Sequence, residues 1–343
     1  MDTVRVGIIG FGRIGAEHAG WLSSAGNARA VAVVDATPAR QELARQRGLC
    51  VVDALDALLT DSSIDAILVS SPTAMHFEHA SRALAAGKHL MVEKPMALDL
   101  HQARTLRNEA KTHKLVLSVF HNRRWDIDYL TVRDAIASGA FGKVINIESR
   151  LGQFSSCVGP AAKEYRPNWR NEASFGGGGL YDWGSHFVDQ IWRLLLPARP
   201  LRVFAQLRAN LWSQDCDDFA RVLIDFDDGV AGLVEINTTT MAPLPRWQID
   251  GTQGSASSPA SLAFDTRAWA DLQFTPAAGE PRAFPIAAQG LSETQIWDQF
   301  ASSVRGQGEP AVTADSVLPT MELLDAARES SRTGRAVEVN PET

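Results

Sequence analysis

The sequence has few of the residues and patterns that mark disulfide-rich, membrane-spanning or metal-binding proteins. Its 343 residues include three cysteines, Cys50, Cys157 and Cys216, an odd number with no metal-ligand spacing. This count argues against a disulfide framework or a zinc site and is typical of a reducing compartment. No apolar run approaches the roughly 20 residues of a membrane helix, and the chain begins in a strand-like pattern instead of a secretory signal. We therefore expect a soluble, cytoplasmic protein that binds neither a metal nor a membrane.

Basic clusters are also scarce. The formal net charge is -7, and no run of five or more basic residues occurs. The sequence thus lacks the electrostatic footprint of a nucleic-acid-binding protein, and small-molecule partners are expected. The length exceeds the size at which one hydrophobic core usually stops growing, which predicts two domains.

The first 120 residues alternate short, β-rich apolar runs with helix-like stretches. This alternation is typical of βαβ units and predicts a doubly wound parallel sheet. The expected strands are Val4–Ile9, Ala30–Val34, Ala66–Val69, His89–Val92 and Leu115–Phe120. From about residue 143, longer alternating runs such as 144–148 and 221–226 predict strands with one solvated face. The turn at 227–229 joins two such runs, so we expect antiparallel pairing and an α+β second domain.

A glycine motif directly follows the first expected strand and opens a helix-like stretch. The motif comprises Gly10, Phe11, Gly12, Arg13, Ile14 and Gly15. In a dinucleotide-binding (Rossmann) unit the first glycine makes a tight turn, the second admits the pyrophosphate, and the third lets helix and strand pack closely. Asp35 follows Gly15 by 20 residues, the offset of the acid that binds ribose hydroxyls. The alternative is a βα turn that binds nothing.

Asp35 also bears on the choice of cofactor. Its carboxylate would repel the extra phosphate of NADP, which favours NAD. Arg40 is near enough in sequence to soften this repulsion, so use of both cofactors stays open.

Three further motifs complete a recognisable set. They are Ser70 to His76, Glu93-Lys94-Pro95, and the glycine-rich stretch from Gly176 to His186. With the Gly10 to Gly15 loop, this set resembles the glucose-fructose oxidoreductase / inositol dehydrogenase family (Gfo/Idh/MocA) over nearly the whole chain. Asn122 to Asp126, followed by Tyr129-Leu130-Thr131, resembles the branch of that family that contains scyllo-inositol dehydrogenases.

The resemblance implies a domain plan. An NAD-binding Rossmann domain would span 1–121, and an α+β substrate and oligomerisation domain with a large, mostly antiparallel open sheet would span 122–312. A C-terminal helix and tail, 313–343, would pack back on the Rossmann domain. Family members commonly pair through the open sheet, so a homodimer or homotetramer is expected.

The resemblance also implies roles for individual residues. Lys94 would reach the reacting hydroxyl, and Glu93 would lie near the nicotinamide ribose. His186 would accept the proton, with Asp182 as its polarising neighbour. The cofactor would be bordered by Ser71, Pro72, Thr73 and His76, although Thr73 stands where an asparagine is common.

The residues around His186 support its role independently. If 181–196 is a helix, Val188, Ile191, Trp192 and Leu195 form its core stripe. Asp182, His186, Gln190 and Arg193 then lie on the opposite side, with Asp182 one turn before the imidazole. A solvent-facing histidine, a solvent-facing Lys94 and a merely flexible glycine loop remain as alternatives.

Aromatic and arginine side chains near these motifs suit a polyhydroxylated ring, although ordinary packing also explains them. The candidate substrate contacts, besides Lys94, Asp182 and His186, are Asn122, Arg124, Trp125, Tyr165, Trp169 and Arg170. The expected activity is hydride transfer between NAD and a secondary alcohol of a sugar, anhydrosugar or cyclitol. The alternatives are an NAD-dependent glycoside-cleaving or internally recycling sugar oxidoreductase, and a non-catalytic NAD-sensing protein.

Overall fold

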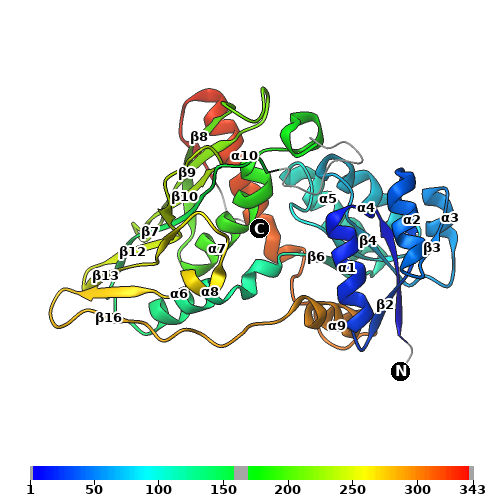
Figure 1. The fold of residues 1–343 in the computed structure, drawn as a ribbon, viewed down its shortest axis with the longest axis horizontal. Helices are drawn as coiled ribbons and strands as arrows, with labels where there is room; N and C mark the ends of the chain where they lie inside the picture. The colour runs from blue at the N-terminus through cyan, green and yellow to red at the C-terminus, as the bar shows by residue number, and fades with distance from the viewer. Residues whose placement is uncertain (1–2, 158–168, 340–343) are drawn as a thin grey trace.

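The computed structural model describes residues 3–157 and 169–339, and its two large sheets lie side by side (Figure 1). The first is a six-stranded parallel sheet in the order β3-β2-β1-β4-β5-β6, the doubly wound arrangement that the sequence predicts. Its strands are β1 (Val4–Ile9), β2 (Ala28–Val34), β3 (Cys50–Val51), β4 (Ala66–Val69), β5 (His89–Val92) and β6 (Leu117–Val119). Strand β3 was not predicted, because two residues carry no periodic signal.

Helices cover both faces of this sheet, so its strands are mostly apolar. These helices are α1 (Arg13–Ser24), α2 (Pro38–Gln46), α3 (Leu55–Thr60), α4 (His76–Ala85) and α5 (Leu100–His113). The strand order reverses at β1, which pairs with β2 on one side and with β4 on the other. Ligands of such sheets bind at this switch point, beyond the carboxyl ends of the strands.

The second sheet has nine strands among the described residues, in the order β16-β15-β13-β12-β7-β10-β9-β8-β17. Among the described strands of this sheet, only β7 and β10 pair in parallel; the other neighbours are antiparallel, as expected for this domain. The strands are β7 (Val144–Gly152), β8 (Pro200–Arg208), β9 (Phe219–Phe226), β10 (Ala231–Asn237), β12 (Trp247–Gly251), β13 (Gly254–Ser257), β15 (Gln273–Pro276), β16 (Arg282–Ala283) and β17 (Val337–Glu338). A small ribbon joins β11 (Leu244–Pro245) and β14 (Ala260–Ser261).

Helices cover the face of the second sheet that is turned toward the first domain (Figure 1). They are α6 (Ile127–Ala137), α7 (Ser185–Leu194), α8 (Thr266–Trp269) and α10 (Leu318–Thr333). The opposite face of this sheet carries exposed apolar side chains. Phe204 of β8 and Leu223 of β9 lie opposite each other there and are 37% and 41% exposed. No helix in the described parts of the chain combines the length and apolar character that crossing a membrane requires.

Two late helices cross the expected domain boundaries. Helix α9 (Glu293–Val304) lies inside the range expected for the second domain, yet it packs on α1 and β2 of the first. Helix α10 contacts α5 of the first domain, and Asp325 accepts a hydrogen bond from the Leu100 amide at 2.8 Å. It also packs on α7 and β8, because its apolar residues are buried on more than one side. The tail then joins the second sheet as β17 instead of packing on the first domain.

Candidate active site

A cavity lies at the switch point of the parallel sheet. It is lined by Gly10, Gly12, Arg13, Ile14, Asp35, Arg40, Ser71, Pro72 and Trp169, among others. Gly10 adopts a φ of 88°, the left-handed region that a tight turn after β1 requires. A Cβ on Gly15 would lie 2.2 Å from the Gly10 carbonyl oxygen, so only glycine lets α1 pack this closely on the turn.

The geometry of the turn fits a dinucleotide. Helix α1 begins at Arg13, and its N-cap Gly12 contributes no side-chain cap, so the first amides of the helix are available to an anion. Phe11 differs from its neighbours, because its side chain is buried in the core and only its backbone belongs to the turn. The residues present therefore match the requirements of a bound pyrophosphate.

The Asp35 carboxylate is held at the end of β2 by two backbone amides. Oδ2 accepts from Phe11 N at 2.6 Å, and Oδ1 accepts from Thr37 N at 2.8 Å. The guanidinium of Arg40 lies beside Gly12, where a Cβ would meet Nη1 at 3.5 Å. The acidic side chain of Asp35 and the basic side chain of Arg40 thus line the same end of the cavity.

His76 and Thr73 position loops next to the cavity. The two ring nitrogens of His76 lie 2.9 Å from the carbonyl oxygens of Ser71 and Pro95. A neutral imidazole carries one N–H and donates to one of them at a time, and burial lowers the pKa of His76. Thr73 is buried, and a Cβ on Gly176 would lie 2.9 Å from its Cβ.

A second cavity continues from the first, since Arg13, Ser71, Trp169 and Arg170 line both. It brings together most of the residues that the sequence analysis selected: Glu93, Lys94, Asn122, Trp169, Arg170, Asp182 and His186. It also contains residues that the sequence analysis missed: Arg123, Asp126, Trp183 and Glu293. Tyr165 lies outside the described residues.

Lys94 reaches across this cavity to Asp182. Its Nζ donates to the Asp182 carbonyl oxygen at 2.6 Å and to Oδ1 at 3.3 Å, and Arg170 Nε lies 3.3 Å from the same Oδ1. Burial lowers the pKa of Lys94, and the Asp182 carboxylate opposes this shift. Burial alone would raise the pKa of Asp182, but Lys94 and Arg170 hold it below its usual value.

The expected pairing of Asp182 with His186 is not what the structure shows. Within the described parts of the chain, the side chain of Asp182 bonds to Lys94 and Arg170, and His186 Nδ1 is buried without a partner. The cause is local: residues Leu180–Gly184 form a π-helical turn, and α7 starts only at Ser185. The wider turn breaks the α-helical spacing on which the expectation depended.

His186 is 4% exposed and lines the cleft, so it is not a solvent-facing histidine. Burial, followed by the positive charges of Lys94 and Arg123, holds the pKa of His186 well below its usual value. The ring of His121 stands edge-on to it, with centroids 5.4 Å apart, and burial lowers the pKa of His121 to about 4. His186 is therefore neutral near neutral pH and able to accept a proton.

Arg124 and Trp125 do not line this cavity, contrary to expectation. Arg124 is buried and donates to both oxygens of Asp189, at 2.8 and 2.7 Å. Trp125 lines a different hollow, with Tyr129. The residues 122–125 form a 3-10 helix, in which successive side chains diverge by about a third of a turn.

Arg123, like Asn122, faces the cleft from this segment. Its guanidinium carbon lies 4.9 Å from the ring centre of Trp183 and 4.3 Å from that of Phe264. Asp126 pairs with it at 3.1 Å. Burial raises the pKa of Asp126 to about 7, against the influence of Arg123.

The glycine run before α7 is explained by close backbone packing. A Cβ on Gly177 would lie 2.4 Å from the Arg170 carbonyl oxygen. Gly178 has a φ of 108°, and a Cβ there would lie 2.2 Å from Asp217 Oδ1. Asp217 also accepts from Leu180 N at 2.7 Å, so the run is held in place against its neighbours.

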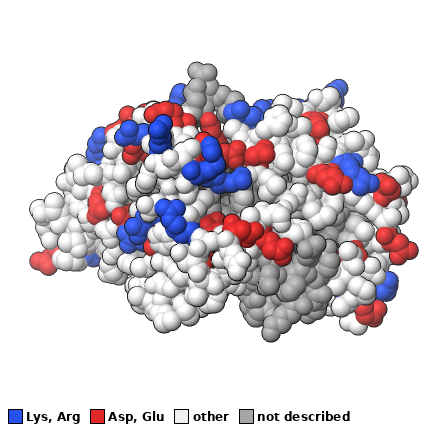
Figure 2. Space-filling view, turned by 90° about the horizontal axis from the view of Figure 1, so that it is seen from above, with Lys and Arg blue, Asp and Glu red and all other residues white. Residues whose placement is uncertain are grey.

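Figure 2 shows one face of the molecule, on which Lys and Arg side chains are interspersed with Asp and Glu among mostly uncharged residues. The cleft itself combines cations, carboxylates and a neutral histidine beside a dinucleotide cavity. These features define an NAD(P)-dependent oxidoreductase.

The comparisons with known proteins identify the family. Residues 4–121 match the model described as an oxidoreductase family with an NAD-binding Rossmann fold, and residues 129–257 match the GFO/IDH/MocA C-terminal domain. The chain belongs to the Gfo/Idh/MocA oxidoreductase family, as its motifs predict.

Similar proteins extend over almost the full length of the chain. The uncharacterized oxidoreductase YdgJ of Escherichia coli is 37% identical and covers 96% of this chain and 97% of its own. The scyllo-inositol 2-dehydrogenase (NADP(+)) IolW of Bacillus subtilis is 26% identical over 98% of this chain and 96% of its own. Among solved structures, an NAD-binding protein from Listeria innocua superimposes with a TM-score of 0.87 at 27% identity, covering 98% of this chain and 97% of its own.

Proposed function

We propose that the chain transfers hydride between NAD and a secondary alcohol of a sugar, anhydrosugar or cyclitol. The observation that carries the proposal is the meeting of a neutral, buried His186 and a Lys94 ammonium in one cleft that adjoins the dinucleotide cavity. The nicotinamide ring, when bound, accepts the hydride. The chain itself must take the hydroxyl proton and balance the charge of the oxygen.

His186 is the candidate base. An alcohol is too weak an acid to lose its proton unaided near neutral pH, so a neutral side chain in the cleft has to accept it. Lys94 is the candidate group that binds the oxygen of the substrate hydroxyl, and the Asp182 carboxylate holds the Lys94 ammonium in place. A non-catalytic NAD-sensing protein would not need a proton acceptor and an ammonium group in the same cleft.

The substrate class rests on the cleft and on named relatives. Arg123, Asn122, Asp126 and Glu293 supply donors and acceptors for several hydroxyl groups, and Trp169 and Trp183 supply aromatic surface. Besides IolW, relatives are named inositol 2-dehydrogenase, from Rhizobium meliloti, and 1,5-anhydro-D-fructose reductase, from Ensifer adhaerens. Asp35 supports a preference for NAD, whereas the name of IolW and the position of Arg40 support use of NADP as well.

The test is a screen of cyclitols, aldoses and anhydrosugars with NAD and with NADP, read at about 340 nm, the absorbance of the reduced nicotinamide. Net formation of NADH with a simple polyol, abolished in His186→Ala, is the expected result. The recycling alternative predicts a product without net NADH, and the sensing alternative predicts cofactor binding without turnover.

We also propose a homodimer or homotetramer formed through the open face of the second sheet. Phe204, Leu223 and Leu233 lie directly opposite one another on β8, β9 and β10 and form an apolar stripe. The ion pair between Arg221 and Glu235, at 2.6 Å, flanks the stripe. Apolar residues with a charged rim are typical of subunit interfaces.

A further inference from the structure

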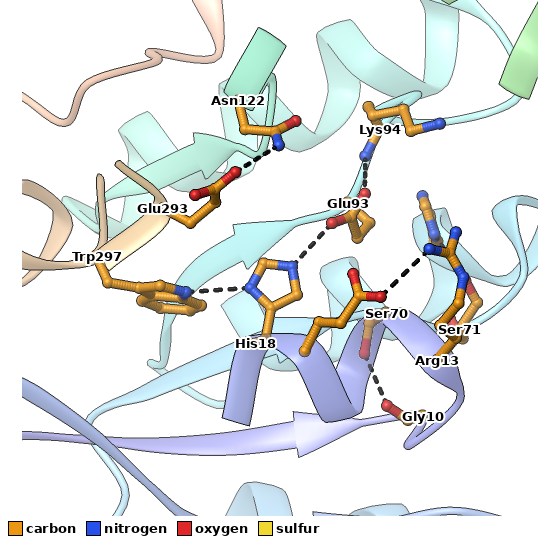
Figure 3. Close-up of polar contacts among 12 residues, drawn as sticks. Gly10, Arg13, His18, Ser70, Ser71, Glu93, Lys94, Asn122, Glu293 and Trp297 are labelled. Atoms are coloured by element: carbon orange, nitrogen blue, oxygen red, sulfur yellow. Dashed lines mark hydrogen bonds and ion pairs between the residues drawn. The ribbon is translucent and has the colours of Figure 1, made fainter. Parts of the chain in front are cut away.

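A chain of three hydrogen bonds leads from helix α9 to Lys94 (Figure 3). Trp297 Nε1 donates to His18 Nδ1 at 3.0 Å, and His18 Nε2 lies 2.8 Å from Glu93 Oε1. The other carboxylate oxygen, Oε2, accepts from the Lys94 amide at 3.1 Å. The chain thus joins α9, α1 and the end of β5, three elements of the first domain.

The donors and acceptors of this chain fix the protonation of His18. An indole N–H can only donate, so His18 Nδ1 must carry a lone pair. The proton of the imidazole is then on Nε2, from which it is donated to Glu93. His18 is fully buried, with the rings of Phe120 and Trp297 edge-on to it at 4.3 and 5.5 Å between centroids, so the ring has little room to turn over.

Glu93 depends on this donor. The residue is 6% exposed, and a buried carboxylate without donors takes up a proton instead of staying charged. Burial raises its pKa, but the hydrogen bond from His18, together with Lys94, holds the pKa below its usual value. The ionised carboxylate then anchors the backbone of Lys94, whose side chain reaches Asp182 across the cleft.

We propose that His18 and Trp297 are positioning residues for Lys94: Trp297 fixes His18 in its Nε2–H tautomer, and His18 holds Glu93 ionised against the Lys94 amide. Helix α9 is thereby part of the active-site support, although it is far from the cleft motifs in sequence. The consequence for turnover rests on the proposed function; the tautomer does not.

The first test reads the tautomer directly. Long-range 1H–15N spectra of the full-length, 15N-labelled protein distinguish the two neutral imidazole tautomers, and loss of a signal in His18→Gln assigns His18. We expect the pure Nε2–H pattern in the unaltered protein. In Trp297→Phe, which keeps an aromatic ring but removes the donor that occupies the Nδ1 lone pair, we expect Nδ1 to carry a proton as well in part of the molecules. Trp192→Phe is the matched control, since it removes another buried indole hydrogen bond, to Thr320 at 2.9 Å. An unchanged His18 pattern in Trp297→Phe, or an Nδ1–H pattern in the unaltered protein, overturns the proposal.

The second test reads turnover of the polyol found in the screen. His18→Gln keeps a donor and an acceptor on neighbouring atoms, whereas His18→Leu keeps bulk and has neither. We expect kcat to fall about tenfold to a hundredfold in His18→Leu, the range of one hydrogen bond to an ionised group, with KM little changed and most activity restored in His18→Gln. Equal loss in both variants, or loss in neither, contradicts the positioning role. If no polyol is turned over, the proposed function fails, and the spectra still decide the tautomer.

Discussion

Replacing Asp182 with asparagine should lower the pKa of Lys94 and leave the titration of His186 unchanged. In the structure the Asp182 carboxylate lies 3.3 Å from Lys94 Nζ and is the strongest influence that opposes the effect of burial on the Lys94 pKa. Asp182 is not among the leading influences on the pKa of His186, which are burial and the positive charges of Lys94 and Arg123. The substitution keeps the shape of the side chain and removes its charge.

The size of the effect follows from the geometry. Two unit charges at this separation of 3.3 Å attract by about 5 kcal/mol at an effective dielectric constant of about 20. This is an upper bound, because both side chains are partly exposed, at 17% and 18%, and because asparagine and the Asp182 carbonyl oxygen still accept hydrogen bonds. A hydrogen bond to a charged group contributes about 1.5–3 kcal/mol, so we expect the Lys94 pKa to fall by about one to two units.

The assay is kcat/KM for polyol oxidation from about pH 4.5 to about pH 10.5, a range that extends well below ordinary histidine titration, because the pKa of His186 is lowered, and up to ordinary lysine titration. Lys94 balances the charge of the oxygen only while protonated, so activity should decline as the pH rises through its pKa. In Asp182→Asn this decline should begin about one to two units lower. Asp134→Asn, in an exposed pair with Arg133 at 2.8 Å, is the control. The reasoning is refuted if the rise of activity at low pH shifts in Asp182→Asn while the decline at high pH stays in place. Asp182 would then influence the titration of His186 and not that of Lys94.

Four other outcomes are expected. His186→Ala should lower kcat by about 10² to 10⁴ with NAD affinity little changed, and retention of a third of the activity would rule out this base. Asp35→Ser should narrow the preference for NAD over NADP by about tenfold, which corresponds to about 1.4 kcal/mol; an unchanged ratio of kcat/KM values contradicts this role. Leu223→Arg should reduce the mass seen by light scattering if the sheet face is the interface, and an unchanged mass places the interface elsewhere. Arg124→Met should cost about 3–5 kcal/mol in denaturant unfolding by leaving Asp189 buried and unpaired, and near-normal stability contradicts this structural role.

Much of the fold was predictable, because parallel strands are buried on both faces. The apolar runs at 4–9, 66–69 and 89–92 begin and end where β1, β4 and β5 do. The acidic turn at 227–229 likewise marked the antiparallel pair β9 and β10. The two-residue strands β3 and β17 left no periodic signal, since they are defined by their neighbours' edges and not by a pattern of their own.

The site was predictable in its residue types and less so in its pairings. Lys94, Asp182 and His186 do meet in one cleft, but which pairs with which depends on backbone geometry that periodicity cannot supply. A π-helical turn begins at Leu180 and changes the spacing of the residues that follow, and Asp182 pairs with Lys94 instead of His186. In the same way, a 3-10 helix turns Arg123 into the cleft and Arg124 into the core, although the two are adjacent and chemically identical.

Helix α9 shows a limit of a different kind. Its start carries a local signal, a capping box between Ser292 and Gln295, and its apolar residues Ile296, Trp297 and Phe300 predict an amphipathic helix. These apolar residues do not indicate on which of the two domains the helix packs, because burial in any apolar surface of matching shape would stabilise the helix equally well. Polar contacts determine where the helix docks. Trp297 Nε1 donates to His18 Nδ1, and Asp298 accepts from the Asn27 amide at 2.8 Å. A buried indole and a buried imidazole each need a partner, so their mutual satisfaction fixes the docking of α9 on α1 more specifically than the apolar stripe does.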